Sequence, residues 1–223
     1  MSLPPTVKHK AIPFLAALLC LVLLASCQSA YYSTMEKLGI PKREIMVDRV
    51  EAARDSQQQA KKEFASALEE FQAVINSAAT PLDEKYKKIN KVYEGCADKA
   101  EEVRTRIGKI EDVSEALFDE WQAELQLYTS PALKRSSEQK LKNTRNRYHR
   151  LIDAMKRAEA KIHPVLDVFR DQVLFLKHNL NAQAIASLQT ELNNIETDVA
   201  RLIREMEASI NEADAFLATL NQQ

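Results

Sequence analysis

Glycine and aromatic residues are scarce in this sequence: the 223-residue chain holds 3 glycines, and aromatic residues make up 6% of it. Sheet-rich folds draw on aromatic and β-branched residues and need frequent tight turns, so this composition disfavours them. Charged residues make up 28% of the chain. Because Ala, Leu, Glu, Lys and Gln are readily accommodated in helices, the composition predicts an all-α protein.

The sequence lacks the motifs that are typical of nucleotide, metal, thiol-exchange and haem sites. Gly39, Gly95 and Gly108 stand alone, and no GxxxxGK[ST] motif provides a phosphate-binding loop. The histidines after residue 100 are far apart in the sequence, and no CxxC pair is present, which disfavours metal, thiol-exchange and haem sites. We therefore expect a non-enzymatic protein with no cofactor and no bound nucleotide.

The chain also has no excess of Lys and Arg over Asp and Glu. The formal net charge is −1 at pH 7, whereas proteins that bind nucleic acid neutralise phosphates with clustered Lys and Arg. Nucleic acid is therefore excluded as an expected partner.

The N-terminus has the pattern of a secretory signal. Lys8 and Lys10 precede an almost continuous apolar run from Ala11 to Leu24. That run is shorter than the ~20 residues that a spanning helix needs. We interpret residues 1–26 as a lipoprotein signal peptide. The alternatives are an ordinary membrane anchor, or a cleaved signal that a cysteine follows by chance.

The residues that end this run, Leu24-Ala25-Ser26-Cys27, resemble the lipobox of bacterial lipoproteins. The resemblance implies that Leu24, Ala25 and Ser26 are recognised by the signal peptidase and that Cys27 carries the lipid. Two or more acyl chains anchor a protein stably to a membrane. By the same resemblance, Gln28 in place of aspartate implies an outer-membrane lipoprotein that faces the periplasm.

Residues 27–42 are expected to form a lipidated tether. The tyrosine pair at 31–32, Gly39 and Pro41 interrupt the helical pattern. We therefore predict a non-helical segment with a hinge at Gly39.

From residue 43 to residue 223, apolar positions recur with alternating spacings of four and three residues. A sustained 3.5-residue period predicts helices that pack along a narrow seam. Proline-containing breaks near residues 80, 130 and 163 are short, which predicts antiparallel neighbours. The expected fold is an elongated antiparallel helical bundle or coiled coil of about four long helices, over residues 43–79, 82–129, 131–162 and 164–221.

Two breaks in this pattern need separate predictions. His163-Pro164 is expected to end the third helix, because proline removes a backbone donor and clashes with the preceding turn. Residues 179–184 contain no glycine or proline, and we favour a continuous helix there over a turn.

Cys96 falls on the seam, where a cysteine behaves as a small hydrophobe. We interpret it as a buried thiol, and an intermolecular disulfide is the alternative. Residues 165–176 are apolar over more than one face and are expected to lie inside the bundle. The sharper hypothesis is a partner-binding or self-association patch whose candidate residues are Trp121, Val165, Phe169, Phe175 and Leu176.

Two further segments, YYSTMEKLGIPKR at 31–43 and FRDQVLFLKHNLNA at 169–182, resemble an uncharacterised family of bacterial envelope lipoproteins known only as a domain of unknown function. The resemblance spans essentially the whole chain after Cys27. It implies helical structure and an envelope location, and it implies no activity.

The expected function is that of a structural, scaffold or docking element that reaches into the periplasm from the lipid on Cys27. Its partner is expected to be an envelope protein or a second copy of the chain. The alternative is a periplasmic carrier or chaperone that binds an apolar ligand or an unfolded chain in a helical groove, motivated by the apolar breadth of residues 165–176.

Overall fold

The computed structural model describes residues 30–77, 80–179 and 182–220, and these fall into two compact units that divide between Ile45 and Met46. In the described part of the chain, every regular element is a helix. The prediction of an all-α protein is therefore confirmed.

In the first unit, residues 30–37 are helical and a glycine ends the helix. Gly39 has φ +83°. Its N–H donates to the Glu36 carbonyl and the Ile40 N–H donates to the Met35 carbonyl, both at 2.9 Å. This pair of bonds is a Schellman motif, which favours glycine because the residue must adopt positive φ. The prediction of a non-helical tether is wrong here, since the tyrosine pair at 31–32 lowers helix propensity only by tenths of a kcal/mol.

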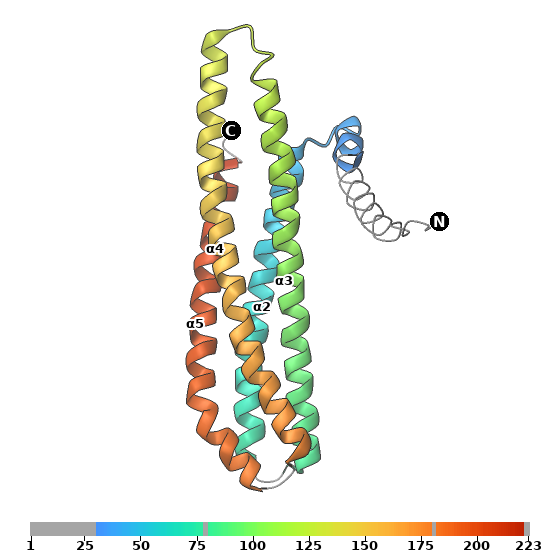
Figure 1. Cartoon of the computed structure of the whole chain (residues 1–223), viewed down its shortest axis with the longest axis vertical. Helices are drawn as coiled ribbons and strands as arrows, with labels where there is room; N and C mark the ends of the chain where they lie inside the picture. The colour runs from blue at the N-terminus through green and yellow to red at the C-terminus, as the bar shows by residue number, and fades with distance from the viewer. Residues whose placement is uncertain (1–29, 78–79, 180–181, 221–223) are drawn as a thin grey trace, which may run out of the picture. The chain divides into compact units, whose positions relative to one another are not determined.

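The rest of the chain forms an elongated antiparallel bundle, as predicted (Figure 1). Each helix runs opposite to the one before it. The four long helices are α2 (Lys42–Asn76), α3 (Leu82–Glu124), α4 (Pro131–His178) and α5 (Ala182–Leu220).

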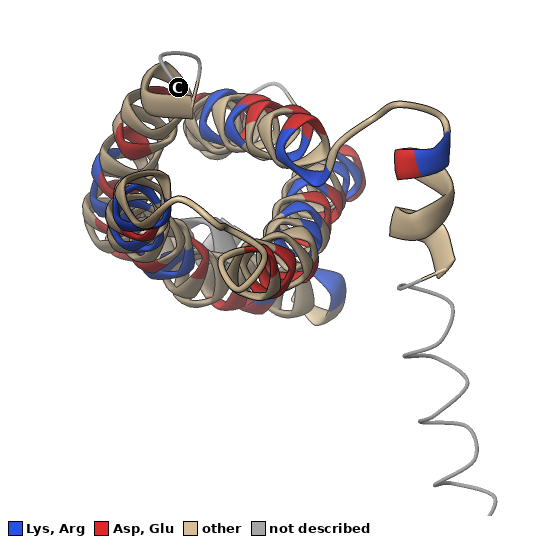
Figure 2. Ribbon diagram, turned by 90° about the horizontal axis from the view of Figure 1, so that it is seen from above, with Lys and Arg blue, Asp and Glu red and all other residues tan. Residues whose placement is uncertain are grey.

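The four helices form a closed ring in which α5 returns to lie beside α2 (Figure 2). Between α2 and α3, Lys99 Nζ donates to Gln59 Oε1 at 3.0 Å. Between α2 and α5, Arg54 Nη1 lies 3.1 Å from Asp214 Oδ1. These exposed pairs contribute little stability individually, but they show that α2 contacts antiparallel neighbours on both sides.

The core follows the predicted seam closely. Along α2, every seam position that the structure describes is buried, including a glutamine. The same holds for most seam positions of the other helices, although Tyr128 and Leu133 at the α3–α4 turn are exposed. The buried α2 positions are Met46, Val50, Ala53, Gln57, Ala60, Phe64, Ala67, Phe71 and Val74.

Aromatic side chains from opposite helices meet in this core. The rings of Phe71 on α2 and Phe169 on α4 have centroids 5.9 Å apart, and both side chains are at most 1% exposed. Gln57 is the main polar exception, and its Oε1 accepts a hydrogen bond from Ser209 Oγ on α5 at 2.8 Å. A buried polar pair of this kind favours one register of the two helices over others.

Helix α4 continues through Pro164, so the predicted helix end at His163-Pro164 is wrong. Pro164 lies on the solvent face, and so does Ala160, whose carbonyl loses its partner in the helix. That carbonyl is therefore open to water, which lowers the cost of the missing bond. On the opposite face, Ile162 and Val165 are buried and keep the seam continuous.

The chain instead turns after His178, so the predicted continuity through residues 179–184 is also wrong. Asn179 ends α4: its Nδ2 donates to the Phe175 carbonyl at 2.9 Å, and its backbone N–H donates to the Leu176 carbonyl at 3.3 Å. Lys177 and His178 lie in the last turn, where positive charge interacts favourably with the helix dipole. Asparagine therefore supplies the stop that glycine or proline supplies elsewhere.

Helices α2 and α3 end earlier than residues 79 and 129, the predicted limits. After Glu124 the backbone tightens, since Gln126 N–H bonds to the Ala123 carbonyl and Leu127 N–H to the Glu124 carbonyl. The start of α4 agrees with the pattern: Ser130 Oγ accepts from Leu133 N–H at 3.4 Å, and Pro131 occupies the first turn.

Replacing Phe71 by alanine tests the core directly. Phe71→Ala removes a fully buried ring and is expected to lower the free energy of unfolding by about 3–5 kcal/mol. Phe175→Ala removes an identical ring that is 39% exposed, and it is expected to change stability by about 0.5 kcal/mol or less. Urea unfolding followed by far-UV circular dichroism measures both, and equal losses would contradict the assigned core.

Candidate docking site at the α3–α4 end of the bundle

Helices α3 and α4 continue past the ends of α2 and α5 at one end of the bundle (Figure 1). Arg49, on the second turn of α2, donates to the Lys109 carbonyl of α3 at 3.4 Å. Arg147 of α4 bonds to Thr219, one residue before α5 ends. Because the helices are antiparallel, residues 117–144 lie largely beyond α2 and α5. We call this segment the α3–α4 extension.

A small apolar cluster holds the two helices of the extension together. Phe118, Leu125 and Leu141 are buried, and Trp121 and Tyr148 pack against them. The Trp121 indole N–H donates to Ser137 Oγ at 2.8 Å. A tryptophan in a core needs such an acceptor, and a short polar residue at position 137 provides it.

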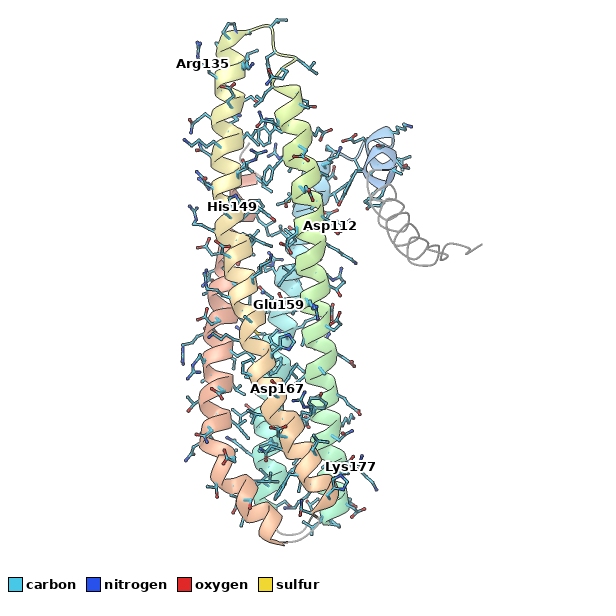
Figure 3. All side chains as sticks on the ribbon, viewed as in Figure 1. Asp112, Arg135, His149, Glu159, Asp167 and Lys177 are labelled. Atoms are coloured by element: carbon cyan, nitrogen blue, oxygen red, sulfur yellow. The ribbon has the colours of Figure 1, made fainter. Side chains whose placement is uncertain are left out.

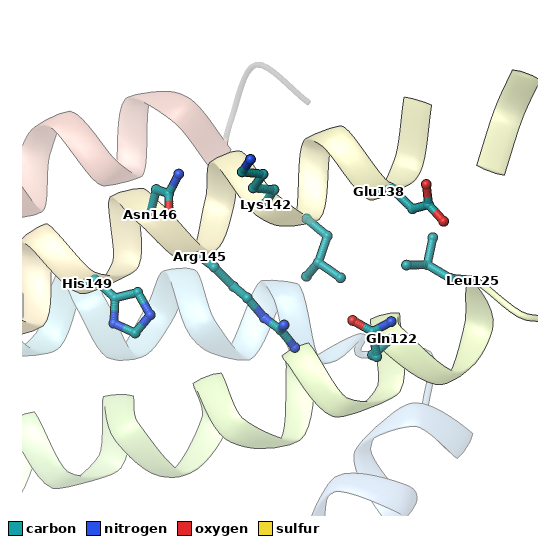
Figure 4. Close-up of a pocket in the computed structure, with 8 residues that line it drawn as sticks. Gln122, Leu125, Glu138, Lys142, Arg145, Asn146 and His149 are labelled. Carbon is teal, nitrogen blue, oxygen red and sulfur yellow. The ribbon is translucent and has the colours of Figure 1, made fainter. Parts of the chain in front are cut away.

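A shallow groove of about 370 Å³ lies on one side of the extension (Figure 4). Arg145 reaches from α4 to α3 across its floor. The Arg145 Nη2 atom donates to the Phe118 carbonyl at 3.3 Å, and its guanidinium carbon lies 5.3 Å from the centre of the Phe118 ring. The groove is lined by Gln122, Leu125, Glu138, Leu141, Lys142, Arg145, Asn146 and His149.

The two helices at this end carry opposite charge. Residues 110–124 of α3 contain six acids and no base, whereas residues 131–150 of α4 contain seven bases and one acid. Figure 2 looks onto this end and shows acidic residues on one helix and basic residues on the other. Just below the basic stretch, Lys156 Nζ of α4 bonds to Glu111 of α3, and this hydrogen bond raises the pKa of the lysine.

The turn that closes the extension exposes large apolar side chains. Leu127 is 79% exposed, Leu133 60% and Tyr128 41%. Arg135 follows on the first turns of α4, and Figure 3 places it at this end of the bundle, opposite Lys177. Apolar side chains gathered at one exposed turn are typical of contact surfaces.

The residues of the predicted interaction patch do not lie together. Val165, Phe169 and Leu176 are buried in the bundle, at most 2% exposed. Phe175 is exposed beside Leu174 on the outer face of α4. Trp121 is half-buried in the extension, at the opposite end of the bundle.

The predicted lipidation and signal-peptidase residues cannot be placed in the structure. Leu24, Ala25, Ser26 and Cys27 lie outside the described residues.

Cys96 is a free thiol and is fully buried, as interpreted from its seam position. Burial, reinforced by the charges of Glu63 and Glu70, raises the pKa of the Cys96 thiol to about 12. At neutral pH almost none of it is in the reactive thiolate form.

Two features are absent from the described residues. None of these helices is long and apolar enough to cross a membrane. No group of three or more His, Cys, Asp or Glu side chains in the same residues is arranged to hold a metal ion.

The sequence reasoning missed most of the extension. Arg145, Lys142 and the exposed leucines at 127 and 133 were not singled out, because each occupies an ordinary position in a helical pattern. The available signal was the separation of charge, with acids over 111–124 and bases over 134–150. Charge blocks of this kind are visible without a structure.

Comparison with known proteins gives one family. Residues 31–220 match the model of a family described as "Protein of unknown function (DUF2959)". No curated protein matches the chain, and no solved structure matches it.

The chain has a single tryptophan, which reports on the stability of the extension. Two helices around a small cluster bury less apolar surface than four, so local unfolding there is expected to cost less than global unfolding. The emission of Trp121 should therefore change at a lower urea concentration than the far-UV circular dichroism. In the double variant Trp121→Phe/Tyr86→Trp, which moves the reporter into the four-helix part, the two transitions should coincide. Coincident transitions in the unmodified protein would contradict a separately unfolding extension.

Proposed function

This chain belongs to that family of unknown function, and we propose that it is a lipid-anchored envelope protein that works as a non-enzymatic scaffold. Cys27 holds it to the periplasmic face of the outer membrane, and the α3–α4 extension is its docking surface. The observation that carries the proposal is the extension itself, which combines exposed apolar residues with two oppositely charged helices.

The order of residues at the N-terminus supports the anchor. Two lysines, an apolar run of roughly 14 residues and the Leu24-Ala25-Ser26-Cys27 sequence follow one another without interruption. Membership of the family covers residues 31–220 and adds no activity. The anchor and the outer-membrane location therefore rest on the sequence pattern.

The structure of the bundle supports a scaffold. Its interior is filled by side chains of the seam, among them Met46, Phe64 and Met155, each at 0% exposure. Close packing along the whole seam makes such a bundle resist deformation. A rigid bundle presents the side chains of the extension in a fixed arrangement, and this is the property that a docking element needs.

The carrier alternative has weaker support. The residues that motivated it, Val165, Phe169 and Leu176, are engaged in the core. The groove on the extension offers Leu125 and Leu141 among six polar side chains. Apolar ligands are usually held in enclosed sites with a mostly apolar lining, so this groove favours a polar surface over an apolar ligand.

The anchor is tested by exchanging Cys27 and Cys96 in turn. In a bacterial host fed labelled palmitate, the wild-type chain should incorporate label, and mass spectrometry should find an acylated N-terminal peptide that begins at Cys27. Cys27→Ala should abolish both signals. Cys96→Ala removes the buried thiol and should leave both unchanged. Palmitate incorporation that survives Cys27→Ala would refute the anchor.

A further inference from the structure

We propose that the turn at the end of the α3–α4 extension contacts the headgroup layer of the same bilayer that holds the lipid on Cys27. The inference rests on the proposed anchor and deepens it, because it identifies the docking partner as an anionic phospholipid surface. The bundle would then touch the membrane at two points, through the acyl chains and through this turn.

The first support is the concentration of exposed apolar side chains. Three of the large hydrophobic residues exposed in the described chain, Leu127, Tyr128 and Leu133, lie within seven residues of one another at this turn. Leucine side chains at such a point can enter the boundary between headgroups and acyl chains. Tyrosine is enriched at that boundary because its ring is apolar and its hydroxyl is polar.

The second support is the charge that borders these side chains. From Leu125 to Lys142 the chain carries four bases, Lys134, Arg135, Lys140 and Lys142, against one acid, Glu138. The acids of α3 end at Glu124, before the turn begins. Lysine and arginine near a membrane are attracted to anionic lipids. Lys134 and Arg135 in the first turns of α4 therefore place positive charge beside the exposed leucines, whereas Asp119, Glu120 and Glu124 keep the neighbouring α3 side acidic. It is the α4 side of the turn that an anionic bilayer surface attracts.

The third support is the direction of the chain. Helix α2 begins at the end of the bundle that carries the extension, since its Arg49 contacts Lys109 of α3. The lipidated cysteine precedes α2, so the anchor is connected to the bundle at this end. The opposite end, with the α2–α3 and α4–α5 turns, is one full helix length away.

The tether is long enough for both contacts. The α4 part of the extension, from Pro131 to about residue 144, is ~20 Å long at ~1.5 Å per residue. Between Cys27 and α2 lie residues 28–41, of which 30–37 are helical. At the ~1.5 Å rise of a helix alone, the contour length of residues 28–41 is already ~21 Å, and any extended residue lengthens it. The turn can therefore reach the bilayer while the acyl chains remain inserted.

A weak contact is sufficient under these conditions. The lipid anchor makes the second contact intramolecular, and a short flexible connection gives it an effective concentration in the millimolar range. Three side chains and a few cations can therefore keep the turn at the membrane, although they would not recruit a free protein from solution.

The test uses the full acylated chain reconstituted in vesicles of phosphatidylethanolamine and phosphatidylglycerol. A nitrobenzoxadiazole label is placed on Leu127→Cys or, as the matched control, on Phe175→Cys, which is also exposed but lies at the other end of α4. Cys96 is buried and Cys27 is acylated, so neither competes for the label. The fluorescence emission of the label at residue 127 should shift to shorter wavelength and be quenched by spin-labelled lipid. The emission of the label at residue 175 should show neither effect.

Charge reversal provides the second measurement. Lys134→Glu/Arg135→Glu changes exposed or half-exposed residues and leaves the core intact. It should reduce the population of the membrane-contacting state by roughly tenfold or more, because each cation contributes separately to the attraction. Vesicles of phosphatidylcholine alone should give the same reduction for the unmodified chain.

The outcomes separate the inference from the anchor. If the protein floats with the vesicles but residue 127 is quenched no more than residue 175, the second contact is refuted and the anchor stands. A wavelength shift that depends on protein density, without quenching by spin-labelled lipid, would refute the lipid contact in favour of a second copy. If the protein does not float at all, the anchor fails and the inference fails with it.

Discussion

The structure of the bundle depends on one constraint: a continuous apolar seam shared by four helices of unequal length. Helices α3 and α4 have 43 and 48 residues, whereas α2 and α5 have 35 and 39. Where all four run side by side, the seam is covered on every side and the buried rings of Phe71 and Phe169 meet inside it. Beyond α2 and α5 only two helices remain, so the seam there must be closed by other means.

Several features of the extension follow from the absence of α2 and α5 there, which leaves its apolar cluster uncovered on two sides. Trp121 and Tyr148 are large enough to cover the cluster from the sides, and Arg145 lies over the Phe118 ring. Two hydrogen bonds also join α3 and α4 there, from Trp121 to Ser137 and from Arg145 to the Phe118 carbonyl. The same features leave an exposed surface of mixed chemistry, and for this reason the proposed docking function is assigned to this end.

The seam was predictable because burial in a helical bundle follows the period of the apolar residues. The pattern therefore identified most core positions of α2, including the polar Gln57, but not Ile45, Ser56 or Ile75, which are also buried. The helix ends were less predictable, because they depend on local hydrogen bonds and on which side of the helix faces water. Pro164 is tolerated since its side of α4 faces water, and Asn179 ends the helix with side-chain and backbone bonds that the pattern does not reveal. The extension could not be predicted, because it arises from the positions of the four helices along the bundle axis. The period of the apolar residues does not specify those positions.

The central claim is that the α3–α4 extension, and no other part of the bundle, is the docking surface. In-cell photocrosslinking tests it most directly, with a photoreactive residue placed at Leu133 or at Leu174, which are 60% and 49% exposed at opposite ends of α4. If the extension is the docking surface, position 133 should give abundant adducts, to lipid or to an envelope protein, and position 174 should give few. Equal adducts from the two positions, or adducts from position 174 alone, would contradict it.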